Sequence, residues 1–375
     1  MLLPTGDAVA SNKSVRGRRE GTMEIRRLYP SDPRGLEQIR TLLARQGLTL
    51  DNHLEYTVGL WEGDRLLATG SFFRSTLRCL AVDEAFRSEG LMATMVTHLV
   101  GELFQRGRHA LFMYTKADMV SRFEGLGFYE VAATSEVALL SNQRDGFDRY
   151  MVGLQQATRD VAQQRGLPGV DAAIPSSQVG AIVMNANPFT LGHRWLVEQA
   201  ARQCDVVHLF MVSEDISAFP LAVRERMIRA GTADLSNVIC HPTGPYLVSS
   251  ATFPAYFIGE GEALTLAQAR IDTAVFVRIA KALGITDRFV GEEPLSPATA
   301  LYNQAMGELL PGAGIRLHVV PRTTGEGTAP ISASRVRALL AAGQLEHVRA
   351  LVPASTYAFL RSDEGQAIAD ALRKG

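Results

Sequence analysis

The fold of the second half of this chain is decided by the stretch Val179-Gly-Ala-Ile-Val-Met184, followed at once by Asn185-Ala-Asn-Pro-Phe-Thr-Leu-Gly-His193. The first six residues are apolar or glycine, which is typical of a strand buried on both faces of a parallel sheet. Thr190 is a favourable N-cap, so we expect a helix from Gly192 to Cys204. A buried strand that leads directly into a helix is the opening unit of a β-α-β fold.

The same alternation of strand and helix continues towards the C-terminus. Further apolar strands are expected at Val206–Val212, Arg288–Val290 and Ile315–Val320, and helices at Pro220–Ala230, at Leu264–Leu283 and after the N-cap Ser296 with Pro297 at the first helical position. Apolar strands separated by helices indicate a parallel sheet covered on both faces. We therefore predict a Rossmann-like, doubly wound α/β domain over residues 178–365.

The first half of the chain is richer in strands. We expect strands at Met23–Leu28, Thr57–Glu62, Arg65–Ser71, Leu77–Val82 and Ala110–Tyr114, with helices at Arg34–Arg45, at Leu91–Arg106 and just before Gly127. The second and third strands meet across Gly63-Asp64, a hairpin signal. This pattern predicts a mixed sheet over residues 23–150. Residues 151–177 are expected to be a linker, with a helix at Met151–Gln164 as an option, and residues 1–22 a disordered extension or the product of an upstream start codon.

Composition narrows the class of protein. The chain has 375 residues and a net charge of −1, so it offers no overall field that attracts nucleic acid or an anionic membrane. No stretch approaches the roughly 18 apolar residues of a membrane-spanning helix. The three cysteines are far apart, and with His98 and His109 they show no metal-ligand spacing. We expect a cytoplasmic protein with no metal site of its own and with neither nucleic acid nor membrane as a partner.

The turn after Met184 carries the first chemical signal. In doubly wound sheets, ligands bind beyond the carboxyl ends of the strands, where a helix N-terminus offers free N–H groups to an anion. Gly192 lets the backbone approach closely, and His193 in the first turn adds a donor that can stabilise charge on a phosphoryl group. The alternative is a simple capped helix start, with Thr190 as N-cap and His193 exposed to solvent.

A second signal lies about 140 residues later, in Ile331-Ser-Ala-Ser-Arg-Val-Arg337. Ser332 and Ser334 can cap a helix or donate to phosphate oxygens, and Arg335 and Arg337 bring positive charge to the same helix start. Cations are unfavourable in a first helical turn unless an anion offsets them. The alternative is a serine N-cap with solvated arginines.

Together the two motifs resemble those of the nucleotidylyltransferase superfamily, over about residues 178–345. The resemblance implies that the motifs bind the phosphates of ATP and favour attack on its α-phosphate with release of pyrophosphate. Thr190 stands where many members have a histidine. The resemblance assigns Thr190 and His193 to the phosphates, Gly192 to close approach of the backbone, and Ser332, Ser334 and Arg337 to the triphosphate. We expect His193 and Thr190 to be the catalytic residues. Further candidates for nucleotide binding are Asn185, Asn187, Pro188, Phe189, Gly291 and Glu292.

A narrower resemblance, to the citrate lyase ligase family, spans about Met23 to Leu360. It rests on the Asn185–His193 block, Pro242–Pro254, Val290-Gly-Glu-Glu-Pro294 and Tyr302-Asn-Gln304. It implies an ATP-dependent ligase that converts acetate to acetyl-AMP, with Mg²⁺ on the phosphates. The acetyl group then passes to the thiol of the prosthetic group on the acyl-carrier subunit of citrate lyase, the implied partner.

The first domain resembles the GCN5-related N-acetyltransferases. Arg87 and Gly90, which precede the helix at Leu91, match the segment that holds the pyrophosphate of coenzyme A in that family, although Met92 fills a position that is small there. The resemblance implies that Arg87 and Gly90 are cofactor-binding residues. This domain would bind acetyl-coenzyme A, hold a pantetheine-like arm, or brace the second domain.

Other functions and other roles for single residues stay open. The chain could be an adenylyltransferase that acts on a nucleotide or a pantetheine phosphate, or a non-catalytic acyl-carrier docking module.

Single residues also have alternative roles. Arg224 and Arg226 would contact substrate or form a solvated helix face, and Glu292 and Glu293 would touch the nucleotide or lie in a surface loop. Expected core or packing residues are Cys79, His208, Trp195 and Leu196; Phe253, Pro254 and Tyr256 would form a lid, a partner surface or a packed loop.

Overall fold

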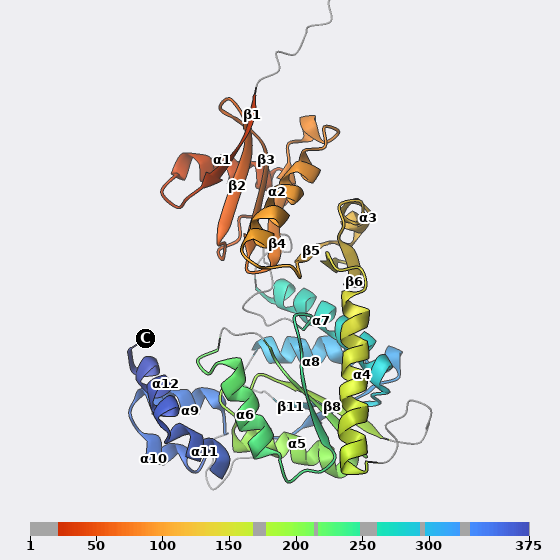
Figure 1. Ribbon diagram of the computed structural model, residues 1–375, viewed down its shortest axis with the longest axis vertical. Helices are drawn as coiled ribbons and strands as arrows, with labels where there is room; N and C mark the ends of the chain where they lie inside the picture. The colour runs from red at the N-terminus through yellow and green to blue at the C-terminus, as the bar shows by residue number, and fades with distance from the viewer. Residues whose placement is uncertain are drawn as a thin grey trace, which may run out of the picture.

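Two β-sheets, one after the other along the chain, make up the architecture (Figure 1). The structure is a computed structural model that describes residues 22–167, 178–213, 217–247, 261–292, 297–322 and 331–374. Within these ranges, no helix combines the length and the apolar character needed to cross a bilayer. The prediction of a mixed sheet followed by a parallel sheet is confirmed.

The N-terminal sheet has seven strands in the order β1-β2-β3-β4-β5-β7-β6. Its strands are β1 (Met23–Leu28), β2 (Tyr56–Glu62), β3 (Arg65–Phe73), β4 (Thr76–Val82), β5 (Phe112–Lys116), β6 (Tyr129–Ala133) and β7 (Val137–Ser141), and its helices are α1 (Pro33–Ala44), α2 (Leu91–Gln105) and α3 (Val120–Glu124). All strand pairs are antiparallel except β4 with β5. The sequence prediction did not include β6 and β7, which have five residues each.

The C-terminal sheet is parallel throughout, with the order β10-β9-β8-β11-β12. Its strands are β8 (Val179–Met184), β9 (Val206–Met211), β10 (Val238–Pro242), β11 (Asp287–Gly291) and β12 (Arg316–Val320). The order turns back at β8, which lies between β9 and β11, so the carboxyl ends of β8 and β11 flank the switch point where such sheets bind ligands. The sequence prediction missed β10, whose polar Cys240 and His241 interrupt the apolar pattern.

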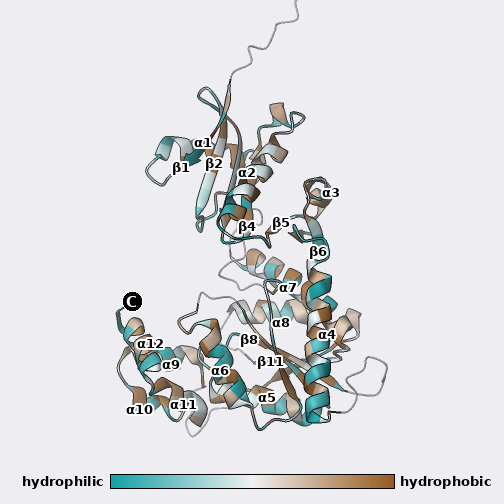
Figure 2. Ribbon diagram, in the orientation of Figure 1, coloured by the Kyte–Doolittle hydropathy of each residue, from teal (hydrophilic) through white to brown (hydrophobic). Residues whose placement is uncertain are grey.

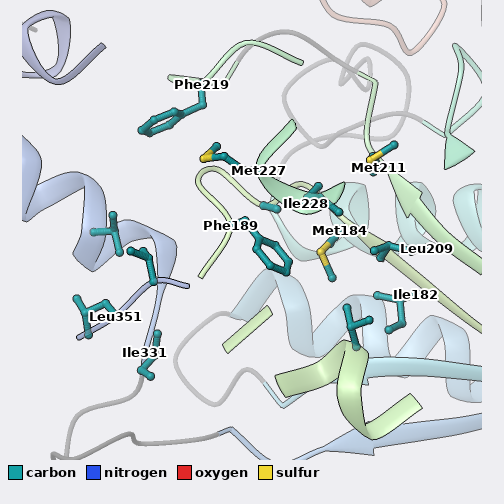
Figure 3. Close-up of a cluster of buried hydrophobic side chains, with 14 of the residues drawn as sticks. Ile182, Met184, Phe189, Leu209, Met211, Phe219, Met227, Ile228, Ile331 and Leu351 are labelled. Carbon is teal, nitrogen blue, oxygen red and sulfur yellow. The ribbon is translucent and has the colours of Figure 1, made fainter. Parts of the chain in front are cut away.

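Helices cover both faces of this sheet. They are α4 (Gly146–Arg165), α5 (Leu191–Gln203), α6 (Leu221–Gly231), α7 (Glu262–Leu283), α8 (Pro297–Leu309), α9 (Ala333–Ala341), α10 (Leu345–Val348), α11 (Ala354–Leu360) and α12 (Asp363–Lys374). One core joins α5, α6 and the C-terminal helices to the sheet; Figure 3 shows Phe189 and Ile228 in this core, with Ile331 and Leu351 from the C-terminal segment. The other core joins α4, α7 and α8.

Helix α4 ties the two domains together. It contains the helix expected at Met151–Gln164 but begins five residues earlier and carries both hydrophobic and hydrophilic stripes (Figure 2). Its Leu154, Thr158 and Ala162 are buried at a spacing of four, the pattern of an amphipathic helix. The Gln155 side chain donates to the Ala282 carbonyl at 2.7 Å. The first part of the expected linker is therefore a packed helix.

Helix α7 lies between the two sheets in Figure 1. Its Ile271 and Val275 belong to a core that also contains Val131 of β6 and Leu139 of β7. The Arg278 guanidinium donates to the Val131 carbonyl. The N-terminal sheet consequently rests on a helix of the C-terminal domain.

Candidate functional site

The turn between β8 and α5 is held by two residues. Thr190 is the N-cap of α5: its Oγ1 accepts the His193 N–H at 3.3 Å, and its own N–H donates to Nδ1 of His193 at 3.1 Å. The start of α5 is therefore capped by Thr190, as the alternative of a simple capped helix predicted. His193 is nevertheless only partly exposed, and it lines a cavity instead of facing open solvent.

The protonation state of His193 follows from these contacts. Burial, and secondarily the positive charge of Arg322, lower the pKa of His193 to about 4, so its ring is neutral at pH 7. Because Nδ1 accepts the Thr190 N–H, we assign the ring proton to Nε2 from this hydrogen bond. His193 is thus a neutral donor in the free protein, fixed in orientation by its own helix cap.

The second motif reaches the same place from the other end of the domain. Gly192 lies so close to Ile331 that a Cβ added to it would stand 3.2 Å from the Ile331 carbonyl oxygen. The Arg337 guanidinium donates to the Asn187 carbonyl at 2.5 Å and to Ser334 Oγ at 3.1 Å. Glycine at 192 therefore serves the approach of the two motifs to each other, a role that the sequence did not show.

The N-terminus of α9 has its own cap. Ser332 is the N-cap, and its Oγ accepts the N–H of Arg335 at 3.2 Å. Arg335 is exposed and does not line the cavity, whereas Arg337, two residues later, does. The charge of the second motif reaches the site through one arginine, not two.

The loop after β8 is anchored from below by Arg224. This side chain is fully buried, and it donates to the carbonyls of Phe219 at 2.9 Å and Val212 at 2.8 Å, and to the carbonyl and Oδ1 of Asn185 at 3.1 and 2.9 Å. Both expectations for Arg224, substrate contact and solvated helix face, are wrong. Its guanidinium replaces water as the donor to carbonyls that the loops leave unpaired.

Arg226 lies away from the site, on the exposed side of α6. Its guanidinium pairs with Glu364 of α12 at 2.5 Å and lies over the ring of Phe359. Of the two expectations, the exposed helix face describes it, and substrate contact is wrong for this residue.

A cavity of about 920 Å³ opens where the two motifs meet. The nucleotide-binding residues expected from the sequence that line it are Asn185, Asn187, Thr190, Gly192, His193, Gly291, Ser332, Ser334 and Arg337. Pro188 and Phe189 do not: both are buried, and the Phe189 ring stacks on His193 with 5.8 Å between centroids. Glu292 is exposed beside the cavity and does not line it.

The far end of the cavity was not foreseen. It is lined by residues of α7, β11 and α8, among them Asp272, Thr273, Phe276, Arg288, Tyr302, Asn303 and Met306. Tyr302 donates to Asp272 Oδ2 at 3.0 Å. The signals in the sequence were Arg288 in the strand expected at Arg288–Val290 and the Tyr302-Asn-Gln304 block, which carried part of the family resemblance but had no role assigned to it.

Other expectations concern single residues. Cys79 is buried, and burial raises the pKa of its thiol to about 12, as expected of a core residue. His208 is buried and shares a hydrogen bond of 3.0 Å with His241 of the neighbouring strand. Trp195 and Leu196 pack against the core, but they also line the cavity. Glu293, Phe253, Pro254 and Tyr256 lie outside the described residues.

Arg87 and Gly90 lie in the N-terminal domain and do not line this cavity. Gly90 is the N-cap of α2 with φ of 73°, a left-handed conformation that favours glycine, and no side chain caps that helix. Arg87 pairs with Glu84 on the surface at 2.8 Å.

Comparison with known proteins gives a consistent result. A family model described as the citrate lyase ligase C-terminal domain matches residues 179–360. The citrate (pro-3S)-lyase ligase of Klebsiella pneumoniae is 40% identical over 329 residues, which cover 86% of this chain and 92% of that protein. The enzyme of the same name from Escherichia coli K12 is 36% identical over 342 residues, covering 90% and 93%.

Solved structures add little. The crystal structure of Escherichia coli ElaA matches 32% of this chain and 100% of its own length, at 14% identity and a TM-score of 0.29. A similarity of that size carries no argument.

Proposed function

The chain belongs to the citrate lyase ligase family, and from that premise we propose that it activates acetate with ATP and acetylates the prosthetic group of citrate lyase. The observation that carries the proposal is the meeting of two distant motifs at one cavity beyond the carboxyl ends of β8 and β11. Two helix N-termini and the half-buried Arg337 at one point are features that suit a triphosphate.

In the first step, an oxygen of acetate attacks the α-phosphorus of ATP. The new bond joins that oxygen to phosphorus, the bond from the α-phosphorus to the bridging oxygen breaks, and pyrophosphate leaves with the electron pair. The N–H of Gly192 at the start of α5, the Nε2 proton of His193 and the guanidinium of Arg337 stabilise the negative charge that builds up on the phosphoryl oxygens. Acetyl-AMP is the product that stays bound.

In the second step, the thiolate of the prosthetic group on the acyl-carrier subunit attacks the acetyl carbon, and AMP leaves with the electron pair. The thiol proton goes to solvent. The chain needs no nucleophile of its own, which agrees with its cysteines, since none of the three lines the cavity. A reducing cytoplasm, where we place this protein, keeps the acceptor thiol free.

Mg²⁺ is expected on the phosphates. Among the described residues, no three His, Cys, Asp or Glu side chains come together as a metal site. A magnesium ion held by the triphosphate and water, as is common for this ion, fits such a site and supplies further neutralisation of the phosphate charge.

For the N-terminal domain, we favour the bracing role among the three that the sequence left open. Strands β6 and β7 pack on α7, and α7 in turn lines the cavity with Asp272, Thr273 and Phe276. The N-terminal sheet thereby supports one wall of the site. Binding of coenzyme A or of a pantetheine arm at Gly90 remains the second candidate, favoured by the uncapped N-terminus of α2.

The test is a set of two assays on the purified chain. With ATP and acetate, pyrophosphate should be released, and addition of citrate lyase with its prosthetic group in the thiol form should yield AMP and acetylated carrier. A stable adenylylated product would instead identify an adenylyltransferase. Binding of the carrier without any release of pyrophosphate would identify a docking module.

A further inference from the structure

Arg288 is a buried charged side chain for which the described residues provide no ion-pair partner. It is 8% exposed, its Nε and Nη1 atoms are buried without a hydrogen bond, and no described residue forms an ion pair with it. The guanidinium lies over the ring of Phe276, with 4.7 Å between Cζ and the ring centroid. Burial lowers the pKa of Arg288 to about 9, so it stays charged at pH 7. Leaving a buried cation unpaired is costly, and proteins do so rarely.

The position of Arg288 separates it from the phosphate motifs. It pairs with Ala181 in the sheet, three residues before Met184, where β8 ends and the first motif begins. At about 3.3 Å per residue, this places its backbone roughly 10 Å below the edge of the sheet. Its side chain shares a face with Val290, the face covered by α7, whereas α5 packs on the opposite face.

Polar and apolar side chains share this end of the cavity with Arg288, and Asp272, Thr273 and Tyr302 are among the polar ones. Phe276, Met306 and Leu247 line the same cavity, and the nearby Tyr302 hydroxyl is engaged by Asp272. Asn303 also lines it, and its Oδ1 is buried without a partner. A triphosphate needs many donors, which the motif end supplies and this end does not. One guanidinium beside apolar side chains fits a small monoanion with an apolar tail.

We propose that Arg288 binds the carboxylate of the acid that the enzyme activates, with the acyl tail against Phe276 and Met306. The proposal rests on the proposed function and deepens it by assigning the second substrate to the end of the cavity between α7, α8 and β11. A planar guanidinium matches a carboxylate with two parallel hydrogen bonds, which would satisfy the buried donors and orient the carboxylate.

The test compares Arg288→Met and Arg288→Lys with the wild-type chain, and with Arg159→Met as control, since Arg159 is exposed on α4 and outside the cavity. Acetate-dependent exchange of pyrophosphate into ATP gives KM for acetate, and calorimetry with α,β-methylene ATP gives nucleotide affinity. Arg288→Met should raise KM for acetate about a hundredfold, as the loss of two charge-assisted hydrogen bonds predicts. Affinity for the analogue should stay within about twofold of wild type, and Arg288→Lys should fall between the two.

Stability without ligand separates this proposal from a structural role. Because the described residues provide no ion-pair partner for the cation, Arg288→Met should leave the urea midpoint unchanged or raise it. A lower midpoint, an unchanged KM for acetate, or a loss of nucleotide affinity equal to the loss for acetate would overturn the proposal. Failure of the proposed function would look different, because the wild-type chain would then show no acetate-dependent exchange of pyrophosphate. In that case, inorganic phosphate or another carboxylate should raise the melting temperature of the wild-type chain and not that of Arg288→Met.

Discussion

Two buried arginines in the C-terminal domain are held in opposite ways. Arg224, on α6, donates hydrogen bonds to four oxygen atoms of the loops around the first motif. Arg288, on β11, has Nε and Nη1 buried without a hydrogen bond. Burial takes both guanidinium groups away from the water to which they hydrogen-bond in the unfolded chain. Of the two, Arg224 replaces these hydrogen bonds with acceptors in the protein, whereas Nε and Nη1 of Arg288 find none among the described residues. The difference is the basis for treating Arg224 as part of the framework and for proposing a ligand at Arg288.

The same contrast distinguishes the two ends of the cavity. At the motif end, Thr190, His193 and Arg337 already make hydrogen bonds within the protein, which fix their orientation before ATP arrives. At the far end, Arg288 and Asn303 keep buried polar atoms without partners. This contrast supports the proposal that the first end is preorganised for a large polyanion and that Arg288 at the second end gains its missing hydrogen bonds from a small carboxylate.

The largest effect should come from Arg224→Met. Removal of this guanidinium leaves the carbonyls of Val212, Phe219 and Asn185, which are buried or part-buried at these contacts, without their donor. We expect a loss of about 3–5 kcal/mol in the free energy of unfolding. Urea denaturation followed by circular dichroism measures it. If this variant were as stable as Arg288→Met, the comparison between the two arginines would fail.

His193→Ala should abolish most activity and leave the fold intact. Loss of one donor to the developing phosphoryl charge costs about 10²–10³ in rate, measured as acetate-dependent release of pyrophosphate. His109→Ala, in an exposed position of the N-terminal domain, is the matched control and should match wild type. Unchanged activity in His193→Ala would show that the motif end is a helix cap and no more.

A smaller effect concerns the pKa of His193. In the free protein it lies at about 4, so the folded chain binds fewer protons than the unfolded chain between about pH 4 and the ordinary value of 6.5, and this residue favours folding less as the pH falls through that window. A bound triphosphate favours the charged ring and should raise the pKa by one unit or more, roughly. Nuclear magnetic resonance titration of the histidines with and without ATP measures the shift.

The buried pair His208 and His241 provides the internal reference for that titration. Burial lowers the pKa of both, to about 4 for His241, and neither lines the cavity. Their signals should not move when ATP binds. Equal shifts for all three histidines would indicate a change of the whole fold instead of contact with phosphate.

Sequence reasoning reached those parts of the molecule that are encoded locally. Strand β8 was predicted with its exact ends, because six consecutive apolar or glycine residues admit few other structures, and Thr190 and Ser332 cap their helices as their positions indicated. Strands β6 and β7 were missed, although β5, β11 and β12, which also have five residues, were predicted, so strand length alone does not explain the miss.

Parts that depend on tertiary contacts were out of reach. Arg224 was read as exposed or substrate-binding, since a helix pattern alone does not show that two loops bring their carbonyls to it. Arg288 was not among the candidate site residues, because the sequence does not show which of its hydrogen-bond donors stay without an acceptor in the fold. The approach of Gly192 to Ile331 likewise joins residues that are far apart in the sequence.

The central claim is that two motifs far apart in the chain bind one triphosphate. Calorimetry with α,β-methylene ATP on wild type, His193→Ala, Arg337→Ala and the double variant tests it directly. The account predicts one binding site in the wild-type chain, weaker binding in each single variant, and a double variant whose loss is smaller than the sum of the single losses, since both side chains contact one ligand. Wild-type binding that survives Arg337→Ala unchanged, or no binding heat in the wild type at all, would contradict it.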